Sequence, residues 1–264
     1  AAKAFIYEFR YGGAVLLFLA AAAVVSSLLL TPAVNRRPPS PRGICVNNIS
    51  NLAKALLYYK SNGGVLSSKI GPPPHHSWRV AILPYLDQDG LYAAYNFDAA
   101  WNAPTNRAVA NAPVRVFKCP TSRTDGGGTP HTNFFAVTGP DTYWGQDAGG
   151  NKRGVSDRLE DTILLIEAPG SHIAWSEPVD FDFEEAVAYL AGESSPAGSE
   201  GRSNKKRVLA ATGRRAYAEI CVAFADGAIR ILSLPLRREV AVALLTANGG
   251  EQVDSEEIYR SPPT

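Results

Sequence analysis

The chain has 264 residues, of which 45% are hydrophobic and 19% are charged, and its formal net charge is +1. A near-neutral balance argues against a nucleic-acid partner, because phosphate binding requires a concentrated basic surface. The 19 prolines and 23 glycines predict a loop-rich domain with short elements rather than a helical bundle. Because the chain begins at Ala1 and contains no methionine, we expect it to be a fragment or a processed form.

The run Gly13–Leu30 is uncharged and apolar, with Ser26 and Ser27 as its only polar side chains. About 18–20 such residues in a helix cross a hydrocarbon core of roughly 30 Å. We therefore predict an N-terminal membrane anchor over residues 1–34. A cleaved signal peptide and a buried core helix are the alternatives, but the run is longer than a usual signal-peptide core and has no polar face. The flanking basic residues, taken alone, would keep the following domain in the cytoplasm.

A proline-rich linker is predicted over residues 35–44, because proline cannot continue a helix and favours an extended chain. The next helix is expected to begin near Asn47, which can cap it, and to end at Asn62, which two glycines follow. Apolar residues fall at helical spacing between these two positions. This helix opens the main domain, which we assign to residues 45–264.

Short strands are expected to follow. Ser77 is predicted to cap a short helix that Pro84 ends, and a strand from Trp78 to Leu83 is the alternative. Strands are expected where β-branched or aromatic residues stand between prolines or glycines, over residues 114–118, 133–138 and 162–168.

The C-terminal part of the chain predicts a hairpin and a last helix. Residues 217–224 and 228–232 are expected to pair across Asp226-Gly227, and the helix follows around Val240. Residues 181–215 predict an irregular excursion from the core with a mobile middle. A helix, then mainly antiparallel strands, then a short helix predict an α+β fold, because no alternating βαβ pattern is present.

Few residues indicate chemistry. Cys45, Cys119 and Cys221 are too scattered for a zinc site; two of them could pair in an oxidising compartment, or they could be buried free thiols. The chain has no motif of a serine hydrolase, a phosphate-binding loop or a zinc protease. We therefore predict no enzyme, no catalytic residue, no metal site and no cofactor.

Some polar and aromatic residues leave two interpretations open. Glu167 could contact a ligand at the end of a strand, or it could be a carboxylate bonded to a loop or an arginine. Trp144 and Trp175 could line a binding cleft, or they could fill the core. Ca²⁺ takes several oxygen ligands at once and could be held by Asp180, Asp182, Glu184 and Glu185, although a solvated acidic loop is the alternative.

Eight stretches of the main domain form a recognisable series. In chain order they are CVNNISNLAKALLYY from Cys45, SWRVAILPYLDQDGLY from Ser77, FDAAWNAPTN from Phe97, FKCPT from Phe117, VSDRLEDTILLIEA from Val155, AWSEPVDF from Ala174, FADGAIRIL from Phe224 and LLTANGGEQV from Leu244. The series resembles the domain of unknown function 1559 family, a pilin-like bacterial family whose older label is solute-binding protein family 10.

The resemblance implies an N-terminal hydrophobic helix, made as a prepilin, that carries an extracytoplasmic α+β head with one N-terminal helix packed on a mainly antiparallel sheet. It outweighs the charge count, so the expected location is the bacterial inner membrane, single-pass, with the head in the periplasm or outside. It also implies a disulfide between Cys45 and Cys119, with Cys221 as a buried free thiol.

The predicted function is that of a membrane-anchored, extracytoplasmic pilin-like protein with a structural or surface-interaction role and no catalysis. The expected partners are the membrane and either other pilin-like subunits or cell-envelope components, and no nucleic acid. The alternative is an extracytoplasmic solute-binding or ligand-binding module that uses Glu167, Trp144 and Trp175.

Overall fold

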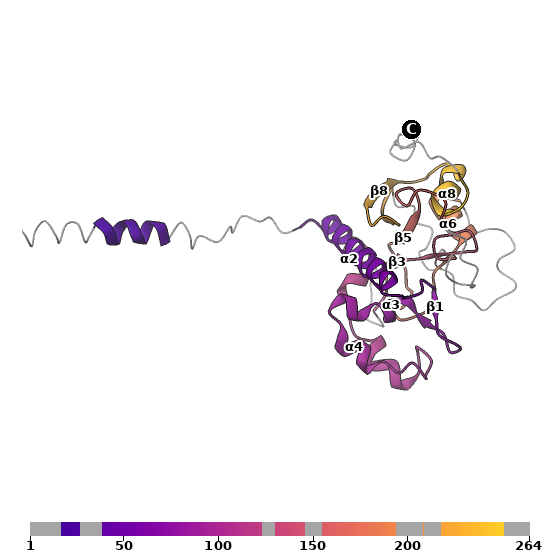
Figure 1. The fold of residues 1–264 in the computed structure, drawn as a ribbon, viewed down its shortest axis with the longest axis horizontal. Coiled ribbons are helices and arrows are strands. Elements are labelled where there is room, and N and C mark those ends of the chain that lie inside the picture. The colour runs from indigo at the N-terminus through magenta and orange to yellow at the C-terminus, as the bar shows by residue number, and fades with distance from the viewer. Residues whose placement is uncertain are drawn as a thin grey trace, which may run out of the picture. The chain divides into compact units, whose positions relative to one another are not determined.

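The computed structural model describes residues 17–26, 39–122, 130–145, 155–193, 208 and 218–250. The chain divides into two compact units, Ala1–Pro39 and Ser40–Thr264 (Figure 1). In the first unit, residues 17–26 form a helix whose large apolar side chains are exposed. The rest of the predicted anchor run, Gly13–Leu30, lies outside the described residues. Within the part of the chain that is described, no helix has both the length and the apolar composition needed to cross a membrane.

The long helix of the second unit, α2 (Pro41–Ser61), begins at Pro41 rather than at the expected Asn47. Ser40 is its N-cap, because the Ser40 hydroxyl accepts a hydrogen bond from the Gly43 N–H at 3.0 Å. Pro41 takes the first helical position, where the missing N–H of proline costs no helical bond. The helix ends at Asn62 as predicted.

An antiparallel sheet with the strand order β3-β5-β7-β8 forms the centre of the second unit. Its strands are β3 (Phe134–Phe135), β5 (Ile163–Glu167), β7 (Glu219–Phe224) and β8 (Ile229–Ser233). The strand predicted over residues 162–168 is confirmed as β5, and the predicted hairpin is confirmed as β7 and β8. Gly227 adopts a φ of +89° in the hairpin turn, a conformation that side-chain-bearing residues rarely take.

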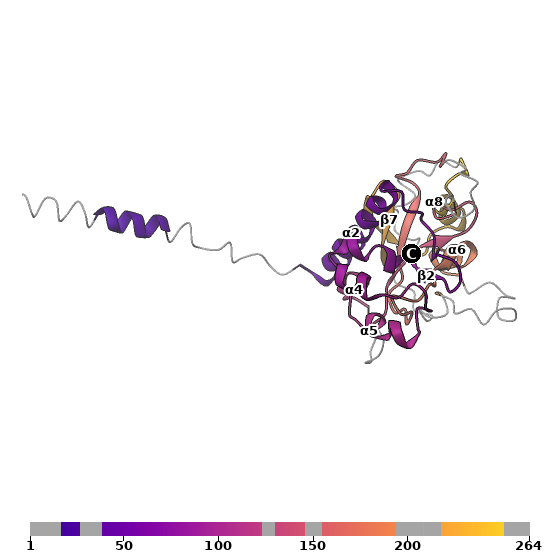
Figure 2. The ribbon, with the colours of Figure 1, turned by 60° about the horizontal axis from the view of Figure 1, so that its bottom comes forward.

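The sheet is covered on both faces. Figure 2 shows β7 between α2 on one side and the helices α6 (Phe183–Leu190) and α8 (Arg238–Leu245) on the other. Cys221 and Ala223 belong to the core cluster that contains α2, whereas Val222 and Phe224 belong to the cluster that contains α6 and α8. This alternation follows from the two-residue period of a strand, and it explains why β7 is apolar almost throughout.

Short elements complete the unit: β1 (Lys69–Ile70), β2 (His76–Ser77), α3 (Trp78–Ala81), η1 (Leu83–Leu86), α4 (Asp89–Ala94), η2 (Pro104–Asn106), α5 (Arg107–Ala110), η3 (Arg115–Phe117), β4 (Val137–Thr138) and β6 (Phe181–Asp182). Strands β1 and β2 pair antiparallel, and β4 and β6 pair parallel. Ser77 caps α3 as predicted, so the alternative of a strand at Trp78 is wrong.

Two predicted strands differ from the structure. Residues 114–118 contain η3 instead of a strand, because the Asn48 side-chain amide of α2 donates to the Arg115 and Lys118 carbonyls at 3.3 and 2.8 Å. Residues 133–138 divide into β3 and β4, which belong to different sheets. The division falls at Ala136, whose N–H donates to the Asp180 carboxylate at 2.9 Å instead of to a strand.

The excursion predicted over residues 181–215 is wrong in its first part. Residues 181–190 form β6 and α6, and α6 is buried against the sheet because Asp182 caps it and an apolar face follows. The rest of the predicted excursion, with its mobile middle, lies outside the described residues, except for residues 191–193 and 208. Mixed helices and antiparallel sheets confirm the α+β class.

Candidate functional site

The predicted disulfide between Cys45 and Cys119 is present, with a Cα–Cα distance of 4.9 Å. It joins the beginning of α2 to the segment that follows η3, and both residues are fully buried. Cys221 on β7 is a buried free thiol, as predicted. Burial, with Glu167 next in effect, raises the pKa of Cys221 to about 12, so the thiol stays protonated and is a poor nucleophile.

Glu167 ends β5 and lies beside this disulfide. Its Oε2 accepts hydrogen bonds from Arg42 Nη1 at 3.0 Å and from the Cys221 N–H at 2.7 Å. The side chain is fully buried, and its Oε1 has no hydrogen-bond partner among the described residues. Burial raises the pKa of Glu167 above its ordinary value of 4.5, although the Cys221 N–H and Arg42 oppose the rise.

Three possible metal ligands lie within 4.8 Å of one another: the Sγ atoms of Cys45 and Cys119 and a carboxylate oxygen of Glu167. Zinc and similar metals bind thiolates, and the two sulfurs are bonded to each other here. The cluster therefore offers one carboxylate, which already pairs with Arg42. In this form, the disulfide and the Arg42–Glu167 ion pair attach the beginning of α2 to the neighbouring segments.

Trp144 and Trp175 belong to one chain of aromatic contacts in the core. Trp144 packs on Trp78 with ring centroids 5.4 Å apart, Trp78 meets Phe117 at 6.5 Å, and Phe117 stacks on Trp175 at 5.4 Å. The two indole N–H groups donate to backbone carbonyls, from Trp144 to Leu164 at 2.7 Å and from Trp175 to Ala112 at 3.0 Å. This is the environment of core residues, and Trp144 also borders a hollow of about 280 Å³.

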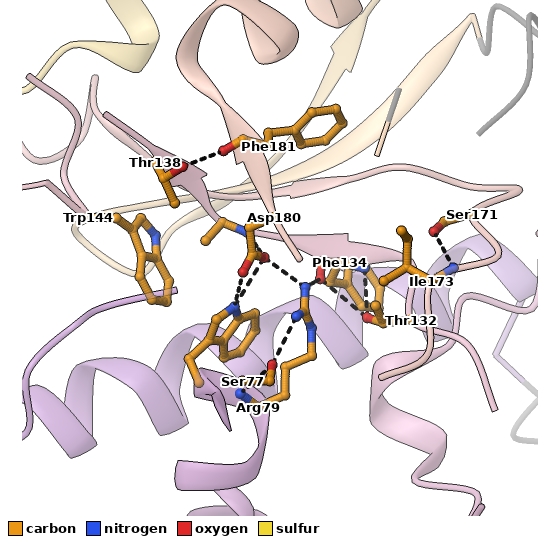
Figure 3. Close-up of polar contacts among 12 residues, drawn as sticks. Ser77, Arg79, Thr132, Phe134, Thr138, Trp144, Ser171, Ile173, Asp180 and Phe181 are labelled. Atoms are coloured by element: carbon orange, nitrogen blue, oxygen red, sulfur yellow. Dashed lines mark hydrogen bonds and ion pairs between the residues drawn. The ribbon is translucent and has the colours of Figure 1, made fainter. Parts of the chain in front are cut away.

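Asp180, predicted as part of an acidic cluster, is the centre of a buried polar network (Figure 3). Arg79 Nη2 donates to Asp180 Oδ1 at 2.8 Å, and the Trp78 indole N–H donates to both carboxylate oxygens at 3.1–3.2 Å. The same guanidinium also donates to the Phe134 carbonyl at 2.7 Å. Burial raises the pKa of Asp180, and Arg79 opposes that rise. The network fastens α3 to β3 and to the beginning of β6.

The other acidic residues of that cluster have separate roles. Asp182 accepts from the Glu185 N–H at 2.9 Å as the N-cap of α6, and Glu184 pairs with Arg238 of α8 at 2.9 Å. Glu185 is buried. The structure therefore places the four carboxylates in different environments and does not bring them together as a cage for Ca²⁺.

A groove of about 890 Å³ runs along the exposed side of α2. Lys54 and Tyr58 of α2 form one wall, Tyr85 and Asp87 a second, and Arg115 with its neighbours a third. The rings of Tyr58 and Tyr85 meet edge to face with centroids 5.5 Å apart. The sequence gives no local signal for this groove, because three distant segments form it and one of them was expected to be a strand.

The fold thus defines an α+β protein in which a disulfide bonds one long helix to the segment after η3, and a partly buried ion pair joins the same helix to an antiparallel sheet. Residues 42–165 match the model of a family described as "Protein of unknown function (DUF1559)", and this match supports the resemblance drawn from the sequence. The match runs from the first turn of α2 into β5. No match was found among curated proteins or among solved structures.

Proposed function

We propose that the chain is a membrane-anchored, extracytoplasmic pilin-like protein with a structural or surface-interaction role and no catalysis. The observation that carries this proposal is the Cys45–Cys119 disulfide. Disulfides form and persist outside the reducing cytoplasm, in compartments such as the periplasm. The proposed location is the bacterial inner membrane, with a single pass and with the head in the periplasm or outside.

The anchor itself is supported by the apolar run Gly13–Leu30, which stands shortly before α2 in the chain. Residues 17–26 of this run are helical and expose Leu17, Phe18 and Leu19 to more than half of their full extent. A helix of this kind is stabilised when lipid covers its apolar side chains, because this removes them from water. The proposed partners are therefore the membrane and either other pilin-like subunits or envelope components.

The test combines fractionation with thiol counting on the full chain. We expect the protein to stay with the membrane after alkaline carbonate washing. Denaturation without a reductant should expose one alkylatable thiol, that of Cys221, and denaturation with a reductant should expose three. Three thiols without a reductant would contradict an oxidising location, and release by carbonate would contradict the anchor.

A second candidate function, an extracytoplasmic ligand-binding module, is favoured by the groove along α2. The exposed Tyr58 ring, the half-buried Tyr85 ring and the cations of Lys54 and Arg115 suit an acidic carbohydrate, because rings cover sugar faces and cations pair with carboxylates. Oligogalacturonate is a suitable probe. Tyr58→Ala should abolish its binding if the groove is the site, whereas loss on Trp144→Phe or Trp175→Phe alone would favour the core tryptophans. Lys69→Ala, an exposed cation outside the groove, is the control.

A further inference from the structure

The register between β7 and β8 determines which backbone groups of β8 point outward, away from the sheet. The Leu234 N–H donates to the Ala218 carbonyl at 2.8 Å, and the Phe224 N–H donates to the Ala228 carbonyl at 2.9 Å. Bonded and non-bonded pairs alternate along an antiparallel ladder. The register therefore turns the backbone groups of three β8 residues away from β7: Ile229, Ile231 and Ser233. On the opposite strand, the Cys221 N–H confirms this assignment, because it points away from Ile231 and donates to Glu167.

No described strand covers this edge. The sheet ends at β8, and no hydrogen bond from the edge groups of these three residues is found among the described residues. Ile231 is 41% exposed. Figure 1 shows β8 at the rim of the head, beyond β5 and far from β3.

The edge also lacks the usual protection against strand addition. Natural edge strands carry outward charges, prolines or bulges that prevent pairing with another chain. The only charged residue of β8 is Arg230, and its side chain turns back over its own sheet. Its Nη1 donates to the Glu160 carbonyl at 2.7 Å, and its guanidinium lies 4.4 Å from the centre of the Phe224 ring.

We propose that β8 pairs antiparallel with β8 of a second copy of this chain, about a two-fold axis at Ile231. Ile231 would then face Ile231 of the second copy, and Ile229 would face Ser233. The three outward residues of each strand would form about six backbone hydrogen bonds in this register. Such a pairing closes on itself and joins the two sheets into one.

The charge of the edge favours an identical partner. A strand that carries an outward charge repels its own copy, because the same charge stands opposite it. The three outward residues Ile229, Ile231 and Ser233 are uncharged, and Arg230 would stand opposite Leu232, so no like charge lies directly opposite in the second copy. A five-residue edge is small beside a standard interface of roughly 1,600 Å². We therefore expect weak association that confinement to one membrane would strengthen.

This inference deepens the proposed structural role, since it names the partner and the strand. Pairing uses the head alone, so the two proposals can fail separately. Release of the protein in the fractionation test would contradict the membrane anchor but not the β8 pairing. Absence of pairing would contradict the β8 proposal but not the anchor.

Cysteine cross-linking of the full chain in its native membrane tests the register. Ile231→Cys should give a dimer band with a short bismaleimide. A mixture of Ile229→Cys and Ser233→Cys proteins should cross-link several-fold more than either protein alone. Tyr92→Cys on α4 is the matched control, because Tyr92 is a large side chain of similar exposure, at 38%. Equal yields from Ile231→Cys and Tyr92→Cys would overturn the proposal, and so would a mixture no better than its components.

Charged substitutions at Ile231 distinguish specific strand pairing from mere proximity of two heads in the membrane. Ile231→Lys alone and Ile231→Glu alone should lower the Ile229→Cys/Ser233→Cys cross-link by roughly fivefold to tenfold, because like charges would stand opposite each other. An equal mixture of the lysine and glutamate variants should restore it. Unchanged thermal unfolding of both variants shows that the head is folded. Persistence of the cross-link in the lysine variant, or no recovery in the mixture, would overturn the proposal.

Discussion

Two buried carboxylates with arginine partners differ in how fully their oxygens are used. Asp180 accepts from Arg79, from the Trp78 indole and from the Ala136 N–H, so both of its oxygens are bonded. Glu167 bonds through Oε2, and its Oε1 has no partner among the described residues. An unsatisfied buried oxygen is costly when it carries charge. We therefore expect the two sites to respond differently to loss of the carboxylate charge.

Glu167→Gln should become more stable relative to the natural protein as the pH rises. Burial raises the pKa of Glu167 in the folded state above 4.5, so the folded protein holds this proton more tightly than the unfolded chain does. The contribution of Glu167 to stability is then full below pH 4.5 and is lost as the pH rises through the folded-state pKa. Urea unfolding of both proteins from pH 4 to pH 8 measures the difference, and a difference that does not change with pH would contradict it.

Asp180→Asn should destabilise the head by about 3–5 kcal/mol, because it leaves the Arg79 guanidinium buried without a counter-charge. Both side chains of this pair are fully buried. The matched control is Glu184→Gln, which removes an exposed pair with Arg238 and should cost less than about 1 kcal/mol. Urea unfolding, followed by the fluorescence of the buried tryptophans, measures both. Similar losses from the two variants would show that the Arg79 network is not the stronger attachment.

At the scale of elements, the turn that ends at Gly145 is held by a close backbone contact. A Cβ on Gly145 would collide with the Gly139 carbonyl, which is backbone and cannot rotate away. Gly145→Ala should therefore destabilise the head by about 1–3 kcal/mol. Gly90→Ala in α4 is the control, because its Cβ would meet nothing within 4 Å, and a helix prefers alanine by about 0.5–1 kcal/mol. Opposite shifts of the two thermal unfolding midpoints are expected, and a harmless Gly145→Ala would contradict the tight turn.

Elements with local signals were predictable from the sequence, and elements fixed by distant side chains were not. Asp226-Gly227 contains its own turn chemistry, so the β7–β8 hairpin follows from adjacent residues. The loss of the strand at residues 114–118 depends on Asn48, which lies far away in the chain. For α6, the capping pair Asp182 and Glu185 was a local signal that an acidic composition concealed.

The candidate sites also differ in whether a local sequence signal or only the fold reveals them. The Cys45–Cys119 pairing came from the resemblance to a family, since spacing alone left several pairings open. Glu167 is an acid at the end of an apolar strand and is visible in the sequence, but its partner Arg42 lies 125 residues away, in a segment predicted as a linker that forms the first turn of α2. The groove between Tyr58, Tyr85 and Arg115 had no signal, because only the fold brings these segments together.

At the scale of the whole molecule, one covalent bond and one ion pair fasten α2 to the rest of the head. The disulfide holds Cys45 in the first turns of the helix, and Arg42 holds the same end through Glu167. The other end has no covalent attachment in the described residues. The stability of the head should therefore depend strongly on the disulfide.

Replacing both Cys45 and Cys119 with alanine should lower the free energy of unfolding by about 4 kcal/mol. The bond closes a loop with a sequence separation of 74, and the cost of closing a loop of that length in the unfolded chain is of this size. The slope of urea unfolding should also rise, because the unlinked chain exposes more surface when it unfolds. Cys221→Ala, which removes a buried thiol and no bond, is the control and should change neither quantity by a comparable amount. A loss of stability in the double variant without a steeper slope would mean that the bond acts through packing at the beginning of α2 rather than through the unfolded chain.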